Sequence, residues 1–86
     1  MPEISRFFGA IISMYYNDHT PPHFHARYGG CKALISIETL AVFEGRLPPR
    51  VLGLVVEWGA LHRAELQENW EQARRDAPLM KIDPLE

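Results

Sequence analysis

Three of the four histidines in this chain lie within seven residues, at His19, His23 and His25. Asp18 precedes the first of them and Arg27 follows the last, so a carboxylate, three imidazoles and a guanidinium fall within one short stretch. Imidazole has an ordinary pKa of about 6.5, which suits it to proton transfer and to metal binding near neutral pH. These five residues are therefore the candidate catalytic or binding residues of the chain.

The first chemistry that fits this stretch is metal binding. Two histidines separated by one residue can offer two ring nitrogens to a single ion, and a third nearby ligand leaves one coordination position open. The ligands would be His19, His23 and His25, or His23 and His25 completed by Asp18.

The second chemistry is metal-free acid–base catalysis on a phosphodiester. His23 or His25 would move protons, while Arg27 would hold the phosphate or stabilise the charge that develops on it. This chemistry requires no cofactor, and we expect none.

Two further interpretations involve no chemistry. The histidines, Arg27 and Tyr28 could form a docking patch for an anion or a protein. Alternatively, the segment is a rigid turn in which Asp18 bonds to its own backbone and the histidines are only polar residues of a strand. The sequence therefore leaves open whether the protein is an enzyme.

The elements around the histidines predict how the side chains are positioned. Thr20-Pro21-Pro22 is stiff, because a residue that precedes a proline favours extended geometry. A strand over His23–Tyr28 alternates its side chains, so His23, His25 and Arg27 share one face. Phe24, Ala26 and Tyr28 share the other face, which is the natural core face, and we expect the first three side chains to point away from the core.

The rest of the chain predicts an α+β fold. Apolar and β-branched runs favour further strands at Ile4–Phe8, Ala10–Tyr16, Lys32–Glu38 and Ala41–Glu44, and Gly29-Gly30 permits positive φ at both positions of a tight turn. Apolar residues then follow helical spacing over 49–76. One straight helix of that length would span about 40 Å, whereas a domain of this size has a radius of gyration of about 12 Å. We therefore expect a break between Gly59 and Ala64; a straight helix whose end meets another chain is the alternative.

The expected architecture is a small, mainly antiparallel sheet of four to five strands followed by two helices, or one kinked helix, packed on one face. The whole chain, 1–86, is expected to form a single domain, with the sheet in 1–46, the helices in 48–76 and an extended tail in 77–86. Trp58 and Trp70 lie on the apolar stripe of the helices, which places them in the core or at a partner interface.

Composition excludes some classes of protein. Cys31 is the only cysteine, so no disulfide forms within one chain. No apolar run approaches the length of a membrane span, so we expect no membrane association and a cytoplasmic location. The net charge is −2, which is unlike a bulk polycation for nucleic acid, so any RNA contact has to come from a local patch.

Four motifs carry a resemblance to a known family: P-x-I-S-R-F-x-G at 2–9, M-Y-x-N-D-H-x-P-P-H-F-H at 14–25, L-P-P-R…E-W…L-H-R-x-E-L…N-W at 47–70 and K-I-x-P-L-E at 81–86. With them the chain resembles the bacterial domain-of-unknown-function family 4160 over nearly its whole length. One departure is Leu40-Ala41, where a turn-like glycine is common in the family.

The resemblance implies a function without a mechanism. Family members resemble the toxin component of a type II toxin–antitoxin pair of the DhiT kind, encoded beside a small partner protein. The expected partners are accordingly a cognate antitoxin-like protein and, if the acid–base chemistry applies, RNA. The active surface would comprise Asp18, His19, His23, His25 and Arg27, with Tyr16 and Tyr28 nearby. The alternative is a non-enzymatic interaction module in which the helices bury a partner and the histidine turn is scaffold; a homo-oligomer is compatible with both.

Overall fold

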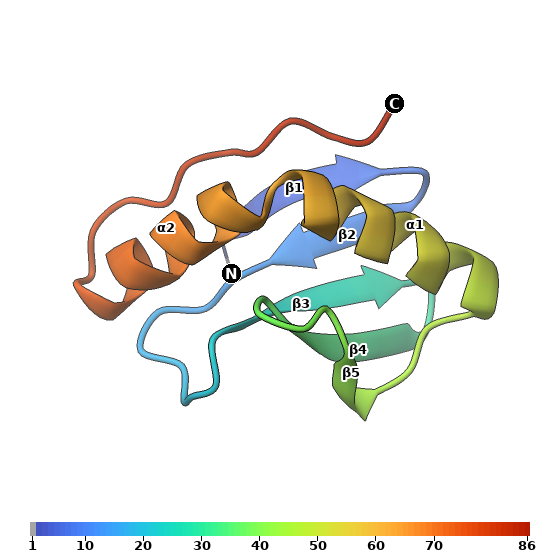
Figure 1. Ribbon diagram of the computed structural model, residues 1–86, viewed down its shortest axis with the longest axis horizontal. Coiled ribbons are helices and arrows are strands. Elements are labelled where there is room, and N and C mark those ends of the chain that lie inside the picture. Colours follow the sequence, from blue (N-terminus) through green and yellow to red (C-terminus); the bar gives the residue numbers. More distant parts are fainter. Residues whose placement is uncertain (1) are drawn as a thin grey trace.

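The computed structural model describes residues 2–86 and shows one five-stranded antiparallel sheet followed by two helices (Figure 1). The strands pair in chain order, each with the next. They are β1 (Glu3–Phe7), β2 (Ala10–Ser13), β3 (His23–Tyr28), β4 (Cys31–Ser36) and β5 (Val42–Gly45), and the helices are α1 (Pro49–Leu61) and α2 (Arg63–Arg74). The predicted α+β fold, with its sheet-then-helices order, is confirmed.

The strand boundaries differ from the prediction where loops begin. β2 ends at Ser13, although the apolar pattern continues to Tyr16, because the chain leaves the sheet there and Met14 bonds instead to the carbonyl of Pro2. At the β3–β4 turn only Gly29 has a positive φ, 56°. That turn pairs Tyr28 with Cys31 and Arg27 with Lys32, which fixes the register of the two strands.

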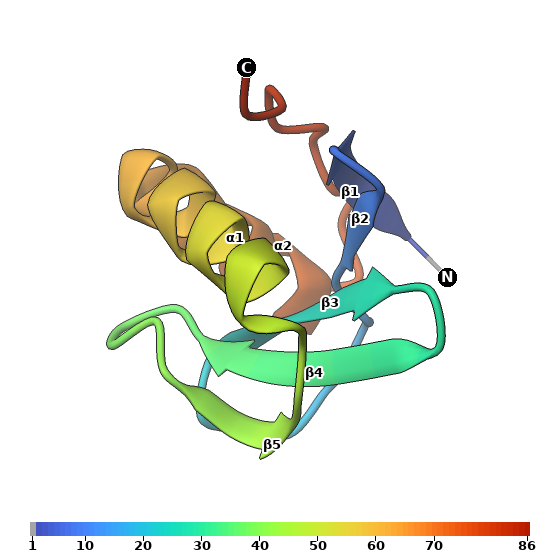
Figure 2. The same ribbon diagram turned by 90° about the vertical axis from the view of Figure 1, so that its right-hand side faces the viewer.

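The two helices lie on one face of the twisted sheet, as the view along them shows (Figure 2). Pro49 opens α1, since a proline is tolerated in the first turn, where its missing N–H needs no partner. His62 separates α1 from α2, within the predicted interval, and its backbone N–H donates to the carbonyls of Trp58 and Gly59. The two helices follow each other end to end along the sheet (Figure 1), and the radius of gyration is 11.6 Å.

The core lies between the helices and the covered face of the sheet. Phe24, Ala26 and Ile35 contribute from the central strands, and Val55 and Leu66 from the helices. Trp58 and Trp70 are also fully buried, so both tryptophans are core residues and neither forms an exposed patch for a partner. Burial of such apolar surface is the main favourable term in folding.

The loop between β4 and β5 contains Leu40, where the resemblance described above led us to expect a glycine nearby. Leu40 has a φ of 61°, a left-handed conformation that costs most side chains free energy. Its side chain is nevertheless buried, and a methyl group added at Gly59 of α1 would lie only 2.9 Å from Leu40 Cδ2. At this position, the packing of the buried leucine side chain against α1 therefore offsets the free-energy cost of the left-handed backbone conformation.

The tail after Arg74 has no helix or strand and returns across the molecule toward β1 (Figure 1). The backbone N–H of Ile82 donates to the carbonyl of Ile4, and Trp58 Nε1–H donates to the carbonyl of Asp83 at 2.8 Å. The buried Asn69 side chain donates to the carbonyl of Met80 and accepts from its N–H. Within residues 2–86 no helix is long and apolar enough to span a membrane.

Candidate functional site

The candidate site lies where the loop from β2 enters β3, at the end of the sheet that α2 covers. Two hydrogen bonds hold this loop at the C-terminal end of α2: the N–H of Asn17 donates to the carbonyl of Ala73, and Asn17 Nδ2 donates to Asp76, which follows the helix. The Thr20–Pro21 peptide bond in the same loop is cis. Asp18 in this loop lies against the first residues of β3, where its side chain contacts His23 and His25.

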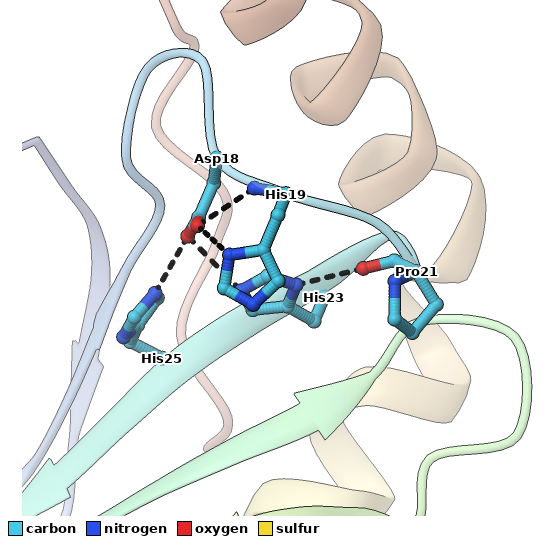
Figure 3. Close-up of polar contacts among 5 residues, drawn as sticks. All are labelled: Asp18, His19, Pro21, His23 and His25. Atoms are coloured by element: carbon cyan, nitrogen blue, oxygen red, sulfur yellow. Dashed lines mark hydrogen bonds and ion pairs between the residues drawn. The ribbon is translucent and has the colours of Figure 1, made fainter.

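Asp18 is the centre of the site (Figure 3). Its Oδ2 lies 3.0 Å from Nε2 of His23 and 3.0 Å from Nε2 of His25. Its Oδ1 accepts a hydrogen bond of 2.9 Å from the backbone N–H of His19 and lies 3.0 Å from Nδ1 of the same residue. One carboxylate thus gathers all three histidines of the segment.

His23 is fully buried, with 0% of its surface exposed. Its ring lies 5.3 Å, between centroids, from Trp70 of α2 and 5.3 Å from Phe43 of β5. Its Nδ1–H donates to the carbonyl of Pro21 at 2.7 Å. The expectation that His23 points away from the packed interior is therefore wrong, because Trp70 and Phe43 close over the end of the strand.

His25 is half-buried, two residues further along β3. Its ring packs edge-on against Tyr15, with centroids 4.3 Å apart. Burial lowers the pKa of His25, and this effect outweighs the hydrogen bond to Asp18, which favours the protonated ring. His25 is thus held neutral more readily than a solvated histidine, with Nε2–H donating to Asp18 and Nδ1 buried without a partner.

The carboxyl group of Asp18 is held in its ionised form. Burial alone would raise its pKa, but the hydrogen bonds from His25 and from the backbone N–H of His19, with the charge of the two rings of β3, lower the pKa overall. A carboxylate is therefore present among the imidazoles at neutral pH.

A small hollow of about 10 Å³ adjoins His25 on the sheet face that the helices leave open. That volume suits about one water molecule. Arg27 and Lys32 line it, and both side chains are exposed. They lie directly opposite each other on β3 and β4, an arrangement of like charges that is unfavourable in a sheet unless an anion offsets it.

The structure thus places the five sequence-predicted residues in two groups. Asp18, His19, His23 and His25 form one cluster, while Arg27 lies on the same strand face but belongs with Lys32 at the hollow. The tyrosines expected nearby lie elsewhere: Tyr16 is exposed in the loop, and Tyr28 packs against the β1–β2 turn at Gly9.

Four contributors to the site were not predicted: Lys32, Tyr15, Phe43 and Trp70. The Gly29-Gly30 turn carried the signal for Lys32, because a two-residue turn pairs the residues on either side of it in order. No local signal pointed to Phe43 or Trp70, which reach His23 from other elements.

Comparison with curated proteins and with solved structures finds no match. A family model described as "Domain of unknown function (DUF4160)" matches residues 9–71. This range includes the Asp18 cluster, the cationic hollow and most of both helices, and it covers more than half of the chain. The chain therefore belongs to the DUF4160 family.

Proposed function

We propose that this protein is the toxin component of a bacterial type II toxin–antitoxin pair, and that in the cytoplasm it acts on RNA at the exposed Arg27–Lys32 pair, which borders the hollow beside His25. The observation that supports an RNA target is the Arg27–Lys32 pair. These two cations face each other across β3 and β4, with no ion pair of either found among residues 2–86. A phosphate bound between them would offset their repulsion.

The proposed reaction is cleavage of an RNA phosphodiester bond, in which the neighbouring 2′-hydroxyl attacks phosphorus and the 5′-oxygen of the next nucleotide leaves. Arg27 and Lys32 would hold the phosphate and stabilise the charge that develops in the transition state. His25 is the residue for proton transfer, because it lines the same hollow and its Nδ1 has no partner in the protein. His23 is not assigned this role, since its ring is fully buried and its Nδ1 is committed to Pro21.

The test is to express the chain alone in a bacterium and to compare Arg27→Ala, Lys32→Ala and His25→Ala at matched soluble levels. Arg50→Ala, an exposed cation of α1, is the control. We expect wild type and Arg50→Ala to arrest growth and degrade cellular RNA, and the three site variants to do neither. Purified wild type should also cleave an RNA oligonucleotide but not its 2′-O-methyl analogue. Arrest that survives in all three site variants would contradict the proposed surface.

The alternative is an interaction module in which the histidine cluster is scaffold. It predicts no growth arrest, or arrest that none of the three substitutions at the hollow changes. Arg27 and Lys32 are informative because both are exposed, so their loss removes charge without opening the core. His23→Ala would not discriminate between the two functions, because it leaves a cavity under Trp70 whatever the function.

A further inference from the structure

We infer that Asp18, His23 and His25 form a binding site for one divalent transition-metal ion of the Zn²⁺ type. The inference concerns the Nε2 side of the histidine rings and does not depend on RNA being the target. One ligand atom from each residue is available, and these three atoms all lie within 4.8 Å of one another. Two imidazole nitrogens and one carboxylate oxygen are a donor set that first-row transition metals accept.

The hydrogen bonds of His23 provide the main argument. The carbonyl of Pro21 can only accept, so the hydrogen of a neutral His23 ring is on Nδ1. Nε2 then presents a lone pair to the carboxylate of Asp18 at 3.0 Å, and two acceptors face each other inside the protein. A cation between them removes this conflict. The conflict is buried, because the His23 ring has no exposed surface.

Two of the three spacings among the ligand atoms are close to those around a bound ion. Ligand atoms at 2.0–2.1 Å from a tetrahedral Zn²⁺ are about 3.3 Å from each other. Asp18 Oδ2 lies 3.0 Å from each of the two Nε2 atoms, slightly closer than around such an ion, and the two nitrogens lie within 4.8 Å of each other. Binding would therefore move the oxygen away from both rings and set the two nitrogens at the spacing that the ion requires. Both Nε2 atoms are directed at the same carboxylate oxygen of Asp18 (Figure 3).

The surrounding hydrogen bonds have the pattern of residues that support metal ligands. Metal-binding histidines almost always donate their second N–H to a carbonyl or carboxylate, as His23 does to Pro21. Asp18 is oriented through its other oxygen by the backbone N–H and ring of His19. His19 is thus a positioning residue rather than one of the three ligands, and the fourth coordination position is left to solvent.

The ion would also define the role of His25 in the hollow. With Nε2 on the ion, the hydrogen of the neutral ring is on Nδ1, so His25 offers the hollow a hydrogen-bond donor and not a base. The metal-free and metal-bound forms should therefore differ in their activity on a phosphodiester bond. Metal binding itself can be measured with no RNA present.

The test uses the full chain purified without a polyhistidine tag, and the probe is Zn²⁺ alone, titrated by calorimetry and counted by elemental analysis. Wild type should bind one Zn²⁺ per chain, and Asp18→Asn and His25→Gln should each weaken binding by more than about 100-fold. The control is His62→Gln, which removes the one histidine outside the cluster and should change affinity less than about two-fold. Mg²⁺, which prefers oxygen ligands, should not compete.

A second measurement distinguishes loss of metal binding from loss of folding in the variants. Co²⁺ added to wild type and to His62→Gln should give the visible absorption band of a four-coordinate nitrogen and oxygen site, and circular dichroism should show that the ligand variants remain folded. The inference is overturned if wild type binds no stoichiometric ion, or if His62→Gln loses as much affinity as the ligand variants. It is also overturned if the folded ligand variants bind as wild type does. Absence of RNA cleavage with intact Zn²⁺ binding would reject the proposed function alone.

Discussion

Gly45, the last residue of the edge strand β5, is a position at which substitution should strongly reduce the stability of the protein. This glycine has a φ of 77°, and a methyl group added there would lie 2.1 Å from the carbonyl oxygen of Lys32. The left-handed conformation costs an L-residue about 1–2 kcal/mol. Relieving the overlap would also stretch the bond from the N–H of Arg46 to the same carbonyl, which is worth about 1 kcal/mol. Gly45→Ala should therefore destabilise the protein by about 2–4 kcal/mol, a large part of a typical folding free energy.

The matched control is Gly53→Ala. Gly53 is exposed in α1 and nothing lies within 4 Å of an added methyl group, so alanine should raise stability by about 0.5–1 kcal/mol. Urea unfolding of wild type and the two variants measures both changes in the free energy of unfolding. The slope of that free energy against urea concentration should be similar in the three proteins. The reasoning is refuted if Gly45→Ala lies within about 1 kcal/mol of wild type. The same substitution should disturb the environment of His23, because β5 carries Phe43 against its ring.

Two more substitutions test how the helices hold the rest of the chain. Asn69→Leu keeps the volume but leaves the N–H and carbonyl of Met80 without their partner. It should cost about 1–3 kcal/mol and speed hydrogen exchange at the Ile82 amide, and unchanged exchange would show that the tail is held elsewhere. Leu40→Gly removes left-handed strain of about 1–2 kcal/mol but also a buried leucine worth about 2–5 kcal/mol. Urea unfolding should show a net loss, whereas a gain would mean that packing against Gly59 contributes little.

The period of the apolar pattern was sufficient to predict the order of elements. In the predicted strand Lys32–Glu38, every second residue is apolar at Ala33, Ile35 and Ile37, and all three are buried. The helix break at His62 followed from size alone, because an unbroken helix would overhang so small a domain. Strand ends were less predictable, since the apolar residues Met14 and Tyr15 continue the β2 pattern after the chain has left the sheet.

The clustering of the site was predictable from sequence, but its burial was not. Asp18, His23 and His25 were candidates because of their types and spacing, and the stiff prolines suggested that the loop would hold them together. What sealed His23 was Trp70 in α2 and Phe43 in β5, whose positions depend on how the helices dock on the sheet. Alternation along a strand assigns a side chain to a face but does not say whether another element covers that face.

The cluster depends on the whole fold rather than on the histidine segment. In a free peptide, ordering each residue between Asp18 and His25 would cost about 1–2 kcal/mol of backbone entropy, and this cost would oppose the binding of any ligand. In the protein the loop is already held to α2 through Asn17, and His23 is fixed by Pro21 and by Trp70. An ion or an anion therefore meets side chains whose positions folding has determined, and the affinity of the site should fall with any change that loosens α2 even when every ligand remains.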